Sequence, residues 1–90
     1  GWFKSLFGNR VYREKEVITD LGDESRLAEV IDRVMKQVEH VYLKSRPKHF
    51  GREVHLEIRI TASGESATEA QGRIDRAMRE LSKWVEILEN

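Results

Sequence analysis

The chain has 90 residues, no cysteine, and 16 basic residues that balance 16 acidic ones, so its formal net charge is zero. This length allows a single domain with a modest core. The lack of cysteine excludes disulfides, thiol catalysis and Cys-based metal sites, and zero net charge leaves no overall field to attract nucleic acid or anionic lipid. No apolar run approaches the roughly 18 residues of a membrane span. These features predict a cytoplasmic protein whose binding sites depend on local clusters of residues.

An aromatic segment, residues 1–9, precedes a single α+β domain that we expect over residues 10–90. Its large apolar side chains would share one face of a short helix that ends at Gly8 and Asn9. They are Trp2, Phe3, Leu6 and Phe7. Three uses are open: a lid over the core, a peripheral contact with a membrane, or an anchor in a partner's groove. The segment is the candidate docking element for a partner or a membrane.

The first predicted strand runs from Arg10 to Asp20 and is polar on both faces in its middle, which is typical of an edge strand. A helix then begins after Asp23, a residue type that is favourable as an N-cap. Apolar residues recur along it at spacings of three and four and predict one buried stripe. The stripe comprises Leu27, Val30, Ile31, Val34, Met35, Val38, Val41 and Tyr42.

The following segment, residues 44–52, holds the only proline, Pro47, together with Gly51, and is predicted to be a loop. Its potential cations are Lys44, Arg46, Lys48, His49 and Arg52, with no acidic residue among them. Because they surround Phe50, the loop could contact phosphates and stack on a base. A flexible, solvated connector is the alternative.

A second strand, from Arg52 to Ser63, alternates strictly between apolar and polar residues, which predicts one face in the core and one in water. Ser66 and Glu69 form an S-x-x-E capping box, so the last helix should start near Ala67. Its predicted core face comprises Ala67, Ala70, Ile74, Ala77, Met78, Leu81, Trp84, Val85 and Leu88. A basic flank of Arg73, Arg76 and Lys83 is a second candidate for phosphate contact.

Motifs of known catalytic or nucleotide-binding sites are absent from the sequence, including the Walker loop, the dinucleotide fingerprint and H-E-x-x-H. His55 lies two residues from both Glu53 and Glu57, so three potential metal ligands project from one strand face. Nearby basic residues compete for these carboxylates, which favours a solvated sheet face over a metal site. We therefore expect no enzymatic activity, no cofactor and no small-molecule substrate.

The predicted fold class is α+β: a short N-terminal helix followed by strand, helix, strand and helix, with both main helices on one face of a small sheet. If the two strands are parallel neighbours, the helix between them makes a right-handed crossover. A two-stranded sheet would leave edge groups unpaired. We therefore expect a homodimer, whose sheet edges join or whose helices pack as a bundle. A strand supplied by a partner is the alternative.

The segment from Glu53 to Ile87, in which a strand leads into the sequence ASGESATEAQGRIDRAMREL, resembles the second strand and helix of Alba-type nucleic-acid-binding proteins. The sequence IDRAMRELSKWVE is similar to the last helix of ribosome-hibernation factors. Both similarities follow generic amphipathic spacing, so we assign no family and transfer no site residue.

The leading functional hypothesis is a small non-enzymatic binding module that contacts RNA, the ribosome or DNA. It would use the basic residues of segment 44–52, assisted by Arg73, Arg76 and Lys83. The first alternative is a protein–protein adaptor or assembly subunit that docks through the aromatic segment. The second alternative is an engineered α+β domain without a natural function.

Overall fold

The computed structural model describes residues 10–89, so the aromatic segment and the helix predicted within it lie outside the described residues. The elements are β1 (Val11–Thr19), α2 (Glu24–Gln37), β2 (Val41–Phe50), β3 (Glu53–Gly64), α3 (Ala67–Ser82) and β4 (Ile87–Glu89). They build an α+β fold with a four-stranded sheet in the order β2-β3-β1-β4. Neighbouring strands are antiparallel throughout. The element order is that of the ferredoxin-like split β-α-β arrangement.

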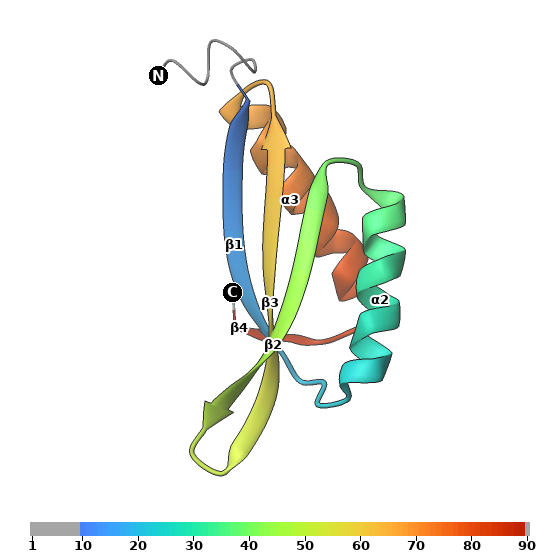
Figure 1. Cartoon of the computed structure of the whole chain (residues 1–90), viewed down its shortest axis with the longest axis vertical. Coiled ribbons are helices and arrows are strands. Elements are labelled where there is room, and N and C mark those ends of the chain that lie inside the picture. The colour runs from blue at the N-terminus through green and yellow to red at the C-terminus, as the bar shows by residue number, and fades with distance from the viewer. Residues whose placement is uncertain (1–9, 90) are drawn as a thin grey trace.

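Both helices cover the same face of the sheet, as predicted (Figure 1). α2 packs mainly against β2, and α3 packs against β3 and β1. Between the layers lie buried side chains from every element except the short strand β4: Val17, Leu27, Val34, Leu43, Ile58, Ile60, Ile74 and Leu81. In the described part of the chain no helix covers the other side of the sheet, which we call the open face. Neither of the two helices in residues 10–89 is long and apolar enough to cross a membrane.

Both helix starts are confirmed. The Asp23 side chain accepts hydrogen bonds from the backbone amides two and three residues later, at 3.0 and 3.3 Å. Ser66 Oγ accepts one from the Glu69 amide at 3.1 Å, and Glu69 Oε1 accepts one from the Glu65 amide at 3.2 Å. These bonds satisfy amides that the first helical turn leaves without a partner.

The first helix ends earlier than predicted, at Gln37. Val38 is extended, and His40 has a left-handed backbone with φ of 60°. The chain therefore reverses and enters β2, so Val41 and Tyr42 belong to a strand and not to the helical stripe. Apolar residues continue at spacings of three and four beyond the end of the helix by coincidence, so the spacing did not show where the helix ends.

The predicted basic loop is in fact the larger part of β2 followed by the turn of a β-hairpin. Phe50 pairs with Glu53, so only Gly51 and Arg52 form the turn. Gly51 has φ of 63°, the positive value that tight two-residue hairpin turns require. Pro47 is tolerated within β2 because this strand lies at the edge of the sheet. Figure 1 shows the end of this hairpin projecting beyond the rest of the sheet.

The two strands predicted from the sequence are not parallel neighbours. β1 and β3 are neighbours, but they are antiparallel, and β1 runs parallel to β2 on the other side of β3. Because β2 and β4 complete a sheet of four strands within one chain, the physical reason for expecting a homodimer no longer applies. The homodimer itself stays a prediction.

The end of the last helix also differs from the prediction. α3 stops at Ser82, and the chain turns back to pair β4 with β1. Val85 is buried, but Trp84 and Leu88, which were assigned to the helical core face, are 46% and 49% exposed. Helical periodicity no longer describes residues that have left the helix.

Candidate functional site

The strand register determines which side chains share the open face, because residues paired across antiparallel strands point to the same side. On β3, the buried alternate residues Leu56 to Ala62 face the helices. The intervening residues of β3, with their partners on both sides, therefore occupy the open face. They are Tyr12, Glu14, Glu16 and Ile18 of β1; Tyr42, Lys44, Arg46 and Lys48 of β2; and His55, Glu57, Arg59, Thr61 and Ser63 of β3.

The structure brings together part of the predicted basic cluster. Lys44, Arg46 and Lys48 form a row along β2 on the open face, because they are two residues apart in a strand. His49 pairs with Val54 on the opposite face, and Arg52 lies in the turn. The side chain of Phe50, the predicted stacking residue, lies outside what the structure describes.

The β2 side of the open face contains a buried carboxylate shared by two cations. Glu57 is only 2% exposed, and its neighbour Ile18 on β1 is also buried. Arg46 Nε lies 2.8 Å from one carboxylate oxygen of Glu57, and Lys48 Nζ lies 3.0 Å from the other. The hydrogen bond from Lys48, reinforced by Arg46, holds the pKa of Glu57 below its ordinary value of 4.5, although burial acts in the opposite sense. One carboxylate for two cations leaves a surplus of positive charge along β2.

The β1 side shows the reverse arrangement. Arg59 Nε lies 3.1 Å from Glu14 Oε1, and Arg59 Nη2 lies 3.2 Å from Glu16 Oε1. All three side chains are about half exposed, between 42% and 53%. Two carboxylates share one guanidinium here, so the β1 side of the open face carries a surplus of negative charge.

Lys44 adds a further positive charge to the β2 side of the open face. It is directly opposite Arg59 across the β2–β3 ladder, and like charges in that position repel each other. Within residues 10–89 no carboxylate forms an ion pair with Lys44. Lys44 and Arg59, together with Arg46 and Glu57, line a shallow depression of about 100 Å³. This is the position on the open face that best suits an added anion.

Two exposed aromatic side chains belong to the same face. Tyr12 on β1 is 67% exposed and Tyr42 on β2 is 61% exposed. They lie opposite Ser63 and Thr61, on the two strands that flank β3. Neighbouring strands are about 4.8 Å apart, which places the two tyrosine-bearing strands roughly 10 Å apart. This pair was not predicted from the sequence, because Tyr42 was expected to lie on a helix.

The basic flank of α3 does not join this site, since α3 lies on the other side of the sheet. Arg73 donates a hydrogen bond to the backbone oxygen of Ser63 and forms an ion pair with Glu69 at 3.1 Å. Lys83 pairs with Glu80, also at 3.1 Å. These contacts give Arg73 and Lys83 roles within the helix layer.

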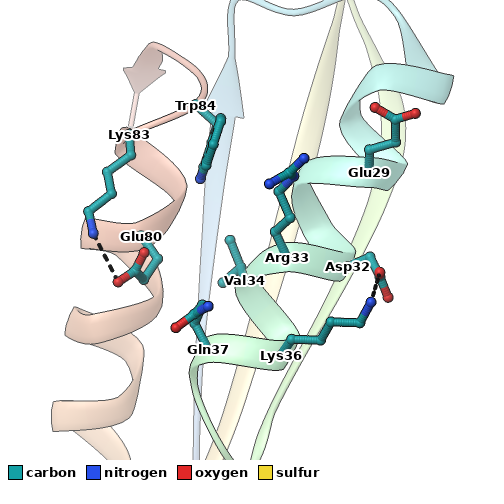
Figure 2. A pocket seen from close by; sticks show the side chains of 9 residues that line it. All are labelled: Glu29, Asp32, Arg33, Val34, Lys36, Gln37, Glu80, Lys83 and Trp84. Atoms are coloured by element: carbon teal, nitrogen blue, oxygen red, sulfur yellow. Dashed lines mark hydrogen bonds and ion pairs between the residues drawn. The ribbon is translucent and has the colours of Figure 1, made fainter.

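A groove of about 710 Å³ runs between α2 and α3. Figure 2 shows the Arg33 side chain directed toward the Trp84 ring, and its guanidinium carbon lies 4.8 Å from the ring centroid. The ion pair of Asp32 with Lys36, at 2.9 Å, is one of two that neutralise charges along the walls. The groove therefore offers no concentrated charge for a ligand.

The three potential metal ligands of β3 do not converge. His55 Nε2 lies 3.3 Å from Glu53 Oε2, but the Glu57 carboxylate is occupied by its two cations. Over the described range, 10–89, no group of three or more His, Asp or Glu side chains is arranged to hold a metal ion.

Two curated proteins are similar to this chain. One, from Caldivirga maquilingensis, is 40% identical over 76 residues, which cover 80% of this chain and 29% of that protein. The other, from Pyrobaculum calidifontis, is 36% identical over an alignment 92 residues long, gaps included, that covers 94% of this chain and 34% of that protein. The chain thus spans about a third of the length of these relatives. No family model matches the chain, and no solved structure matches it significantly.

Proposed function

We propose that this chain is a non-enzymatic module that binds single-stranded nucleic acid on the open face of its sheet. The observation that carries the proposal is the depression around Lys44, whose lining has three cations, Lys44, Arg46 and Arg59, and one carboxylate, Glu57. Arg46 and Arg59 are in ion pairs, and Lys44 is not in one among residues 10–89. Nucleic acid is also the ligand predicted from the sequence, but the proposed contact surface is a face of the sheet and not a loop.

A phosphate group fits the charge arrangement around Lys44. The repulsion between Lys44 and Arg59 would be relieved by an anion between them, and Arg46 borders the same depression. Basic side chains that neutralise phosphates supply most of the affinity for nucleic acids. The negative surplus at Glu14 and Glu16 would repel the backbone, so the phosphates are expected along the β2 half of the face.

The exposed tyrosines favour a single strand over a duplex. Bases stack on aromatic side chains only when they are free of their own stack, and such stacking tolerates any base. Tyr12 and Tyr42 present their rings on the same face as the phosphate position. Four-stranded RNA-binding sheets use surface aromatics in this way, which supports the proposal by analogy.

The test is fluorescence anisotropy with a labelled, unstructured RNA on the order of 10 nucleotides long, titrated at several salt concentrations. We expect Lys44→Glu to weaken binding about tenfold and to reduce its salt dependence. Arg79→Glu makes the same charge change at an exposed position on α3 and should leave binding unchanged. Absence of binding by the wild type, or equal losses in both variants, would refute the proposal.

The adaptor hypothesis concerns the aromatic segment, and the homodimer hypothesis concerns self-association, so neither depends on the open face. The adaptor depends on Trp2, Phe3, Leu6 and Phe7, all outside the described residues. Light scattering on the full chain and on a variant that starts at Asn9 measures the contribution of this segment to self-association. A dimer in both would place the self-association in the α+β domain, and a monomer in both would remove the homodimer hypothesis. The engineered-domain hypothesis also stays a prediction.

A further inference from the structure

β1 has an edge that β4 covers only at one end. β4 pairs with β1 at Ile18 and Thr19. Along residues 11–17, the side of β1 that faces away from β3 has no strand partner among the residues that the structure describes. Backbone N–H and C=O groups on such an edge are ready to pair with an added strand.

The charges on this edge alternate between the two faces of the sheet. Glu14 and Glu16 project on the open face, whereas Arg13 and Lys15 are in register with Ala62 and Ile60 on the helix face. An added strand would therefore meet acidic side chains on one face and basic side chains on the other. This pattern distinguishes between possible partner strands.

The pattern disfavours antiparallel pairing with the same edge of a second copy. Centring the pair on Glu14 sets Glu14 against Glu14 and Arg13 against Lys15. Centring it on Lys15 sets Lys15 against Lys15 and Glu14 against Glu16. Like charges directly opposite each other destabilise a sheet. A β1–β1 dimer is thus a poor occupant of this edge.

We propose that the free edge of β1 binds, by strand addition, an extended partner segment with the opposite alternation of charge. Lys or Arg of the partner would lie beside Glu14 and Glu16 on the open face, and Asp or Glu beside Arg13 and Lys15 on the helix face. Arg59 serves both Glu14 and Glu16, so the site retains a negative charge that a basic partner residue neutralises. Main-chain hydrogen bonds provide affinity in this mode, and the side chains provide specificity.

Two peptides of identical composition test the proposal by NMR titration of the labelled protein without nucleic acid. Val-Lys-Glu-Lys-Glu-Thr-Val has the complementary alternation, and Val-Lys-Lys-Glu-Glu-Thr-Val cannot match β1 in any register. The alternating peptide is expected to bind at least tenfold more tightly and to shift the amide signals of residues 12–16. N-methylation of the peptide amides that face β1 should abolish binding, because the ladder then lacks its donors.

Variants of the protein distinguish a loss of strand addition from a loss of binding that is caused by unfolding. Glu14→Gln with Glu16→Gln should weaken binding of the alternating peptide several-fold while the melting temperature stays nearly constant. Glu24→Gln with Glu29→Gln on α2 is the matched control and should not change binding. Equal affinity for the two peptides, or binding that survives N-methylation, would overturn the proposal. Self-association of the free protein through β1 would overturn the choice of partner.

Discussion

The two sides of the open face carry ion-pair groups of opposite net charge, and the two groups differ in how deeply their shared residue is buried. On the β2 side, two cations share the Glu57 carboxylate, which is 2% exposed. On the β1 side, two carboxylates share the Arg59 guanidinium, which is 46% exposed. Exposed ion pairs contribute little to stability, whereas a buried charge is costly when its partners are removed. The ion-pair group around Glu57 should therefore contribute to the stability of the fold. The group around Arg59 should contribute to the choice of a partner strand.

The two sheet edges differ in a second respect. β2 carries Pro47, and a proline protects an edge strand from pairing with other chains. β1 has no proline. Its charges do not block pairing but select the charge pattern of the strand that pairs. β2 is thus the edge suited to contact through side chains, and β1 is the edge suited to contact through the backbone.

The largest effect is expected from removing both cations that serve Glu57. Arg46→Met with Lys48→Met keeps side chains of similar length against the carboxylate but removes their charges. A buried Glu57 carboxylate without partners should cost about 3 kcal/mol in the free energy of unfolding, measured by urea titration. Arg76→Met with Arg79→Met on α3 is the control and should have a much smaller effect. A loss below about 1 kcal/mol would show that Glu57 is not energetically buried.

A smaller effect is expected from Glu57→Gln, and its pH dependence identifies the cause. The pKa of Glu57 is lower in the folded state than its ordinary 4.5, so its ionised form adds stability above that value. This contribution disappears as pH falls through the lowered pKa. At neutral pH the free energy of unfolding of the variant should be about 1 to 2 kcal/mol lower than that of the wild type. On acidification to about pH 2, the free energy of unfolding should fall less in the variant than in the wild type. Thermal unfolding at a series of pH values measures both quantities, and parallel curves would contradict the assignment.

Arg59→Met tests the exposed group. Because Glu14 and Glu16 stay in contact with water, the free energy of unfolding should fall by less than about 1 kcal/mol. The same variant leaves both carboxylates without their shared cation, so the alternating peptide should bind several-fold more tightly. Chemical denaturation and the peptide titration provide the two measurements. Weaker binding of the peptide would indicate that Arg59 itself contacts the partner.

The smallest effect on stability is expected from Lys44→Ala. Lys44 has no ion-pair partner among residues 10–89 and lies opposite Arg59, so the free energy of unfolding should change by less than about 0.5 kcal/mol. Any change should be toward greater stability, since a like-charge repulsion is removed. RNA affinity should nevertheless fall several-fold. A marked loss of stability would mean that Lys44 has a structural role.

The sequence predicted the elements whose signals are local. The caps at Asp23 and Ser66 and most of the alternation of β3 were read correctly, because each depends on residues within a few positions of one another. The burial departs from the prediction at Val54, which is 47% exposed, and at Glu57, which is 2% exposed. The hairpin was missed although its signals were present. Val41 and Leu43 alternate with Tyr42 and Lys44, and Gly51 begins a two-residue turn, but Pro47 was given the greater weight as a loop residue.

The candidate site was predicted in part for the same reason. Lys44, Arg46 and Lys48 were found as a cluster of charges, yet their common face depends on β2 being a strand. Arg59 and Tyr12 join them only through cross-strand register, which no short stretch of sequence contains. The burial of Glu57 likewise depends on residues contributed by β1 and β2.

By itself the sequence determined the α+β class, the helix caps, most of the apolar faces and the cluster of basic residues, because each arises from short-range periodicity or spacing. The tertiary structure decided the direction and order of the strands, the extension of the sheet to four strands, and which charges meet. Those features depend on contacts between residues as far apart as Glu14 and Arg59. Such contacts form only when the whole chain buries one common core.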